Sequence, residues 1–397
     1  MENKIKEIVN QNFEELVALR EHLHRNPELS NQEYKTQQLI IDFLSKLTGV
    51  EVHKTAETGV VAIIKGKKEF YPNPVIALRA DIDALAIQDE KTCGYQSLVK
   101  GVMHACGHDV HTVILLGVAK VLNTIQNDFS GTVKLFFQPA EETTGGALRM
   151  IQAGWLDNPK VEAVFGLHVD PSIPVGSINY RQGPLFASSD LLKIFVKGKA
   201  SHAGYPEEGV DAIVVASEIV LGLQTIVSRK VSFSDEVVLS FGKITGGEVI
   251  NALAKEVIIE GTLRTFDSSI REKVLSEINH IASHIASAHH AEAKVEVTQG
   301  YPVLSNDKAM VDHLIKVGNR VLGDEKVLER KKPSAGSDDF AYFSQMVSSC
   351  YYLLGVANIE KGINYPLHTP FFDVDPQAIY LGCIMQTMIS LSYLMKV

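Results

Sequence analysis

The 397-residue sequence predicts an α/β protein whose central sheet is covered by helices on both faces, with a smaller α+β domain inserted into it. Near-continuous apolar runs such as VVAIIKG and PVIALRADIDAL alternate with helical segments, which is typical of strands buried on both faces. The stretch from 185 to 298 instead has the order strand, helix, strand, strand, helix, strand of a ferredoxin-like unit. Two domains also suit a chain that is too long for one ordinary core.

The larger domain is predicted to comprise residues 1–184 and 299–397. After an amphipathic first helix, its expected elements are the strand VVAIIKG, the strand PVIALRADIDAL, a helix from about His111 to Ile125, the strand TVKLFFQPAEE, a helix ending at AGW and the strand VEAVFGLHV. The chain returns to this domain through KKPSAGSDDFAYF and a final helix. In such sheets the chemistry gathers at strand ends, where loops converge.

The inserted domain is predicted to comprise residues 185–298. Its expected elements are the strand DLLKIFVKG, a helix from Asp211 to Arg229, the strand EVVLSFGKITGG, the strand EVIIEGTLRTFD, a helix from Ser268 to His289 and the strand AKVEVTQ.

The composition indicates a globular protein that acts on a small molecule or peptide. Hydrophobic residues make up 45% and charged residues 21% of the chain, and the net charge of -9 argues against nucleic acid or an anionic membrane as a partner. The amino terminus lacks the apolar core of a signal peptide, and the apolar stretches Ala212–Val227 and Ile379–Val397 are interpreted as core-facing helices. Four scattered cysteines suggest no disulfide framework, so we expect a cytoplasmic location.

The segment MHACGHDVH (103–111) can be interpreted as a metal site, as a thiol nucleophile beside its base, or as a buried turn. Other residues of metal-ligand type follow predicted strands or lie in loops: Glu141, Glu142, His168 and His368. Imidazole, carboxylate and thiolate together suit a zinc-like divalent metal. An extended chain projects Cys106 and His108 to the same side, and Gly107 between them allows a bend.

The adjacent glutamates are expected to have separate roles. Neighbours in an extended segment point to opposite sides, so we interpret Glu142 as a metal ligand and Glu141 as the general base that takes a proton from water. The competing interpretation makes Cys106 a nucleophile with His108 or His111 as its base, but it gives the other ligand types no role. His104 and His111 are expected to support the site or to pack; Asp109 has no assigned role.

The ordered motifs resemble the aminoacylase and carboxypeptidase branch of the dinuclear metallopeptidases. The resemblance is greatest to the amidohydrolase subgroup that contains hippurate hydrolase, N-acyl-amino-acid amidohydrolases, N-acetyldiaminopimelate deacetylase and auxin-conjugate hydrolases. The motifs that carry it are LHRNPELSNQEYKT (23–36), LRADIDAL (78–85), MHACGHDVH (103–111), FFQPAEE (136–142), GLHV (166–169), KGKASHAGYPEEGVDAI (197–213), GTLRTFD (261–267), AGSDDF (335–340) and LHTP (367–370).

The resemblance implies a zinc-peptidase-like catalytic domain that holds one or two divalent ions of zinc, manganese, cobalt or nickel. The implied metal ligands are Cys106, His108, Glu142, His168 and His368, with Glu141 as the base and Asp83 as a supporting aspartate. The inserted domain would act as a lid and pair two subunits into a homodimer, with His202 reaching the neighbouring site. Asn251 and Arg264 would bind polar groups of the substrate, and the Arg264 fork suits a carboxylate.

Three departures from the family pattern concern substrate preference. Ala86 stands where proline is frequent, NALA (251–254) replaces a commoner asparagine-valine-isoleucine-proline, and AGSDDF has an aspartate where glutamate is usual. The expected reaction is hydrolysis of the amide of an N-acyl-L-amino acid. A dipeptidase with the same metal site and a non-catalytic ligand-binding relative remain the alternatives.

Overall fold

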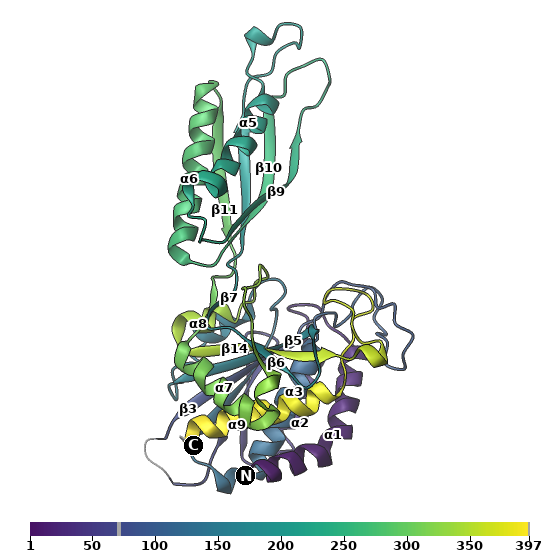
Figure 1. Cartoon of the computed structure of the whole chain (residues 1–397). Coiled ribbons are helices and arrows are strands. Elements are labelled where there is room, and N and C mark those ends of the chain that lie inside the picture. The colour runs from purple at the N-terminus through teal and green to yellow at the C-terminus, as the bar shows by residue number, and fades with distance from the viewer. Residues whose placement is uncertain (70–72, 396–397) are drawn as a thin grey trace. The chain divides into compact units, whose positions relative to one another are not determined.

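The computed structural model describes residues 1–69 and 73–395, and the chain divides into two compact units (Figure 1). The larger unit comprises Met1–Leu185, Ser305–Lys332 and Asp338–Val397, and the smaller unit comprises Phe186–Leu304 and Pro333–Ser337. Residues 299–304 and 333–337, which were predicted to belong to the larger domain, are thus grouped with the smaller unit. The last two residues of the predicted helix Ile379–Val397 lie outside the described residues.

The larger unit is built on an eight-stranded mixed sheet with the order β1-β2-β4-β3-β5-β14-β6-β13. Its strands are β1 (Val50–Thr55), β2 (Gly59–Lys65), β3 (Val75–Asp81), β4 (Thr132–Gln138), β5 (Ala163–Pro174), β6 (Ile178–Tyr180), β13 (Val327–Glu329) and β14 (Ser349–Ala357). The neighbours β4, β3, β5 and β14 run parallel to one another. Every residue of β3 and β4 is buried, which explains their near-continuous apolar sequences.

Helices cover both faces of this sheet, as the alternating apolar pattern predicted. They are α1 (Glu2–Arg25), α2 (Tyr34–Leu44), α3 (His108–Thr124), α4 (Gly146–Gln152), α7 (Lys308–Leu322), α8 (Ala341–Met346) and α9 (Gln377–Met395). The helices α1, α3, α7 and α9 share one apolar core with the sheet, whereas α8 packs on the other face, where Phe343 stacks on Phe136. The predicted α/β class is confirmed.

The smaller unit contains a four-stranded antiparallel sheet with the order β11-β8-β10-β9. Its elements follow the chain as β8 (Asp190–Lys197), α5 (Ala212–Thr225), β9 (Val237–Gly246), β10 (Glu256–Thr265), α6 (Ser268–Ala288) and β11 (Glu292–Gln299). This is the predicted ferredoxin-like order of elements. Alternate residues of β8, such as Leu192 and Ile194, lie in a core shared with α5 and α6. The short strands β7 (Gly183–Phe186) and β12 (Leu304–Asn306) form a separate pair.

Two helical segments are apolar and long enough to cross a membrane by length and composition alone, Ala212–Lys230 and Gln377–Met395. The second is 72% buried, as expected for a core helix. The first, α5 with the turn that follows it, is only 33% buried within this chain. Exposed apolar side chains therefore remain on α5.

Candidate metal centre

The parallel strands β3, β4 and β5 end at one edge of the sheet, and the predicted site residues gather there. Asp81 closes β3, Gln138 closes β4, and His168 lies at the middle of β5. Because adjacent parallel strands bring their carboxyl ends together, side chains that are far apart in the sequence meet at this edge.

Gly107 determines how Cys106 and His108 approach this edge. It adopts a left-handed backbone with φ 84°, and α3 begins directly after it at His108. The extended backbone expected here is therefore wrong, and so is the predicted helix start at His111. The helix begins three residues earlier because the left-handed glycine reverses the chain before the first turn.

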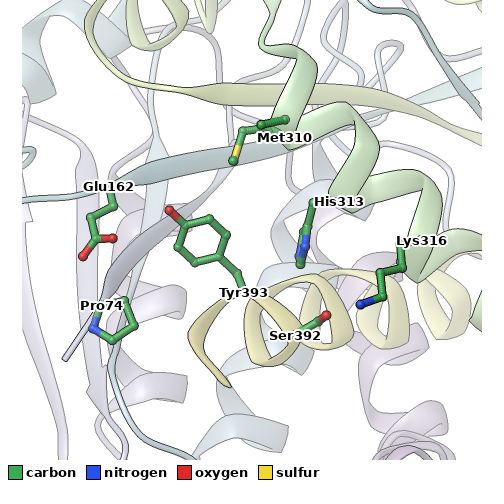
Figure 2. Close-up of a pocket in the computed structure, with 8 residues that line it drawn as sticks. Pro74, Glu162, Met310, His313, Lys316, Ser392 and Tyr393 are labelled. Atoms are coloured by element: carbon green, nitrogen blue, oxygen red, sulfur yellow. The ribbon is translucent and has the colours of Figure 1, made fainter. Parts of the chain in front are cut away.

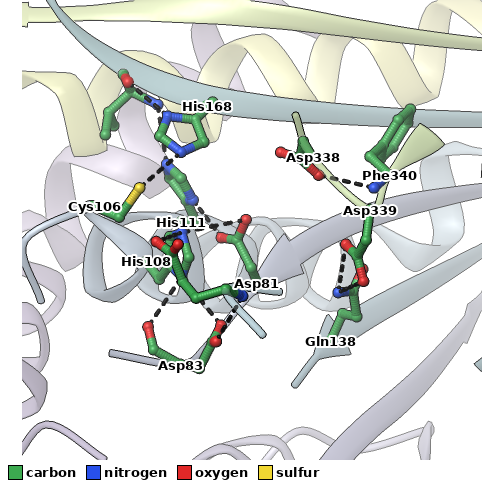
Figure 3. A network of polar contacts seen from close by, with 12 residues as sticks. Asp81, Asp83, Cys106, His108, His111, Gln138, His168, Asp338, Asp339 and Phe340 are labelled. Carbon is green, nitrogen blue, oxygen red and sulfur yellow. Dashed lines mark hydrogen bonds and ion pairs between the residues drawn. The ribbon is translucent and has the colours of Figure 1, made fainter. Parts of the chain in front are cut away.

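The sulfur of Cys106 points toward the imidazole of His168 (Figure 3), and the imidazole of His368 also lies beside it. The Nε2 atom of His168 is 3.3 Å from Sγ, and the Nε2 atom of His368 is 3.2 Å from it. The Oε1 atom of Glu142 is 3.4 Å from Nε2 of His368 and 3.9 Å from Nε2 of His108. All five side chains predicted as ligands thus converge on one region of the larger unit.

The two glutamates lie in a turn that follows Ala140, whose φ is 54°. The expected extended segment, with neighbours on opposite sides, is wrong. Ligand atoms of His108, Glu141 and Glu142 all lie within 4.8 Å of one another, so both carboxylates approach the same centre. A turn that starts from a left-handed residue can direct consecutive side chains to one side, which an extended strand cannot.

Asp83 connects two of these side chains. Its Oδ1 atom is 3.2 Å from Nδ1 of His108, and its Oδ2 atom accepts hydrogen bonds from Ser30 Oγ (2.7 Å) and from the backbone N–H of Glu142 (3.0 Å). Asp83 therefore orients His108 and the glutamate turn together.

The imidazoles are arranged as in metal sites. The Nδ1 atom of His108 faces the backbone oxygen of Asp83 at 3.0 Å, and Nδ1 of His168 faces the backbone oxygen of Val169 at 2.7 Å. In both rings this leaves Nε2 directed at the centre, the usual arrangement of a metal-ligating histidine. The Nε2 atom of His108 is buried and makes no hydrogen bond within the described part of the chain. This donor set fits a divalent cation.

The electrostatics of the site also favour a cation. Burial raises the pKa of Cys106 well above its ordinary value, and the charges of Glu142 and Glu141 raise it further. Burial and Asp338 raise the pKa of Glu141 in the same way. Burial lowers the pKa of His108, but Asp81 and Asp83 outweigh it and raise the pKa to about 10. Two carboxylates beside a buried thiol oppose a free thiolate at this position, whereas a bound cation would stabilise one.

His111 is occupied on both ring nitrogens. Its Nδ1 atom is 2.5 Å from Oδ1 of Asp81, and its Nε2 atom accepts the backbone N–H of Val169 at 3.0 Å. Burial lowers the pKa of His111 to about 4, so the ring is neutral. It supports Asp81 and β5 and is not free to bind a cation. His104 is also buried, and neither of its ring nitrogens makes a hydrogen bond among the residues described.

Sequence reasoning missed a group of buried charges behind the glutamates. Ligand oxygens of Glu141, Asp338 and Asp339 lie within 4.8 Å of one another. Arg79, which is buried in β3, donates to Asp81 at 2.6 Å and to Asp339 at 2.7 Å. An arginine inside an apolar strand and two adjacent aspartates in AGSDDF were the available signals, because such charges are buried only when they are paired.

The remaining predicted residues belong to the smaller unit. His202 and Asn251 are exposed neighbours, since the backbone N–H of Ala203 donates to the backbone oxygen of Asn251 at 2.9 Å. Arg264 is half-buried, and its Nη1 atom donates to Ser337 Oγ at 3.2 Å.

A surface pocket of about 430 Å³ lies elsewhere on the larger unit (Figure 2). Pro74 and Glu162, which line it, directly precede β3 and β5, so the pocket is at the sheet edge opposite the candidate metal centre. None of the predicted site residues lines it.

Comparison with known proteins agrees with this geometry. The sequence model of peptidase family M20/M25/M40 matches residues 77–388. N-acetyl-L-cysteine deacetylase of Bacillus subtilis (strain 168) is 40% identical over 366 residues, covering 92% of this chain and 85% of the relative. IAA-amino acid hydrolase ILR1-like 4 of Arabidopsis thaliana is 34% identical over 388 residues, covering 97% of this chain and 87% of the relative. The solved structure of the Bacillus subtilis YXEP protein, described as a dinuclear metal binding peptidase from the M20 family, has a TM-score of 0.85 and 32% identity, covering 98% of this chain and 99% of that one.

Proposed function

Because the chain belongs to peptidase family M20/M25/M40 and is a metal-dependent amidohydrolase, we propose that it hydrolyses the amide bond of N-acyl-L-amino acids. The acyl group would be an acetyl or aroyl group, and the products would be a carboxylate and a free amino acid. The names of the deacetylase and of the plant hydrolase support this substrate class.

One observation carries the proposal: thiol, imidazole and carboxylate donors from four separate segments of the chain converge, and the buried Nε2 atom of His108 makes no hydrogen bond among the described residues. One or two divalent ions would supply a Lewis acid that acidifies water and polarises the amide carbonyl. The proposed ligands are Cys106, His108, Glu142, His168 and His368, and the proposed ions are zinc, manganese, cobalt or nickel.

Glu141 is the proposed general base. Its carboxylate takes the proton of the attacking water and delivers it to the nitrogen that leaves the amide, so that one residue serves both proton transfers. Its position beside His108 and Glu142 supports this role. Asp83 would keep His108 and the glutamate turn in register through the hydrogen bonds described above.

The smaller unit would complete the substrate site in a homodimer. The Arg264 fork would bind the substrate carboxylate and Asn251 another polar group, while His202 of one subunit would donate to the carbonyl oxygen in the other. The exposed apolar side chains on α5 support pairing through this unit, since Val214 is 54% and Leu221 71% exposed. The proposed location is the cytoplasm, which the four unpaired cysteines support.

A substrate panel with and without chelator tests the reaction. We expect turnover of N-acetyl or N-benzoyl amino acids that chelation abolishes and added metal restores. Turnover of dipeptides alone would favour a dipeptidase, and no turnover of any amide in the metal-loaded protein would favour a ligand-binding relative.

The Glu141→Ala variant tests the general base. It should retain metal but lose about 10²- to 10⁴-fold in kcat, because only the proton carrier has been removed. Glu142→Ala is the matched control, since it should lose metal affinity as well. An unchanged kcat in Glu141→Ala would refute the role.

Mixing variants tests whether His202 acts across the dimer. Glu141→Ala and His202→Ala should each be impaired as homodimers. If subunits exchange, a mixed dimer would contain one site with both native side chains and should regain activity. No recovery, despite demonstrated exchange, would contradict the role of His202 in the neighbouring site.

A further inference from the structure

We propose that Arg20 is a positioning residue of the proposed metal centre, which it serves by tying the start of α3 to the loop that carries His368. This role rests on the proposed function. It gives a role to a buried residue of α1 that takes no part in the proposed reaction itself.

Arg20 and His24 lie one turn apart on α1, and both are buried, with 2% and 0% of their surfaces exposed. A guanidinium is removed from water at a large cost unless carboxylates compensate it. The carboxylates that pair with Arg20 therefore indicate its role.

The first neighbour is Asp109, which follows His108 in the first turn of α3. The Nε atom of Arg20 donates to Oδ2 of Asp109 at 2.9 Å, and Nδ1 of His24 lies 2.7 Å from the same oxygen. Asp109 is fully buried. This contact attaches α1 to the segment that presents Cys106 and His108.

The second neighbour is Asp373, five residues after His368. The Nη2 atom of Arg20 donates to Oδ1 of Asp373 at 2.9 Å, and the Tyr95 hydroxyl donates to its other oxygen at 2.5 Å. Nearby, Lys91 donates to the backbone oxygen of Phe372 at 2.9 Å. At its other end, the loop is held by the backbone N–H of His368, which donates to the Ala105 oxygen at 2.9 Å.

Arg20 therefore bridges two segments that each carry a proposed ligand. A planar guanidinium can hold two carboxylates in a fixed relation, whereas a lysine offers a single point charge. Buried ion pairs contribute little net stability compared with apolar packing. The need to hold these two segments in place therefore explains the buried pair better than stability does. The distance between His368 and the Cys106–His108 segment depends on the bridge.

Three variants test this role. Arg20→Met removes the bridge, and Asp373→Asn weakens only its loop side. Arg271→Met is the matched control, because it breaks a part-buried two-hydrogen-bond pair with Asp190 in the smaller unit, at 2.6 and 2.8 Å. The readouts are Zn²⁺ and Mn²⁺ affinity by chelator competition, and the degree to which each metal protects Cys106 from alkylation. Activity on an N-acetyl amino acid is measured beside them.

We expect Arg20→Met and Asp373→Asn to weaken metal affinity roughly 10- to 100-fold, as loss of an orienting partner does in other metal sites. Arg271→Met should bind metal like the wild type even though it unfolds more easily. Metal affinity and Cys106 protection unchanged in both test variants would overturn the inference, because Arg20 would then only stabilise the fold.

If Arg20→Met does not fold, the metal affinities of Asp373→Asn and Tyr95→Phe test the role instead. Tyr95→Phe removes the hydroxyl that donates to Asp373, and both variants leave Arg20 paired with Asp109. A wild-type protein that binds no divalent metal and cleaves no amide refutes the proposed function. If the wild type binds metal and the variants bind it with the same affinity and protect Cys106 equally, only the role of Arg20 is refuted.

Discussion

Replacing Gly107 with alanine perturbs the candidate metal centre at a single backbone position. Gly107 has φ 84°, and a Cβ atom built on it would lie 2.4 Å from Cγ2 of Val169. The variant therefore incurs both an unfavourable backbone conformation and a steric clash with a buried strand.

The two costs can be estimated separately. A left-handed backbone costs a residue with a Cβ atom about 1–2 kcal/mol, and overpacking a dense interior costs about 1–3 kcal/mol. Alanine also restricts the unfolded chain, which offsets about 0.4–1 kcal/mol. The free energy of unfolding of the larger unit should fall by roughly 1–5 kcal/mol in sum.

Urea unfolding followed by tryptophan fluorescence measures this quantity, because the only tryptophan, Trp155, belongs to the larger unit. Gly101→Ala is the matched control: Gly101 has φ 73°, and its Cβ position has no atom within 4 Å. Gly101→Ala therefore incurs the free-energy cost of the left-handed backbone but no steric clash. Adding Val169→Ala to Gly107→Ala removes the clashing methyl and should recover part of the loss, which a double-mutant cycle isolates.

The reasoning is refuted if Gly107→Ala destabilises the larger unit no more than Gly101→Ala does. The clash would then be relieved by a small shift of Val169, and the glycine would be needed for its backbone conformation alone.

Zn²⁺ should slow alkylation of Cys106 but not of the half-buried Cys93, as followed by peptide mass spectrometry; equal slowing at both thiols would count against ligation. Asp190→Ala leaves Arg271 without its buried partner and should cost the smaller unit about 3 kcal/mol, the low end for buried pairs because the Arg271 side chain is 15% exposed. Hydrogen exchange of peptides from the smaller unit measures this loss, and protection equal to the wild type would contradict it. Leu221→Arg on the exposed face of α5 should convert the proposed homodimer into a monomer in analytical ultracentrifugation; an intact dimer would exclude this face from the interface.

Periodicity and residue type made the order of elements predictable. The apolar runs of β3 and β4 and the helical pattern of α6 are local properties of the chain, and each formed close to where it was expected. Ligand types placed after strands also indicated a metal centre before any contact was known, because parallel strands share one functional edge.

Contacts across long stretches of sequence were not predictable in this way. Arg20 pairs with Asp109, which is 89 positions away in the sequence, and with Asp373, which is 353 positions away. Nothing near Arg20 in the sequence identifies these two partners. The pairing of Arg79 with Asp339 spans 260 positions. The turn that carries Glu141 and Glu142 was expected to be extended, since neither residue type signals the left-handed Ala140 before it.

The chain alone therefore specified which side chains could take part in metal chemistry and on which kinds of element they would lie, because both follow from local composition and spacing. Packing of the larger unit specified that Nε2 of His108 and of His168 faces the centre, and which buried charges hold the ligands in place. Those properties arise from hydrogen bonds and ion pairs between segments that meet only after folding, when water is excluded and a buried polar group without a partner becomes costly.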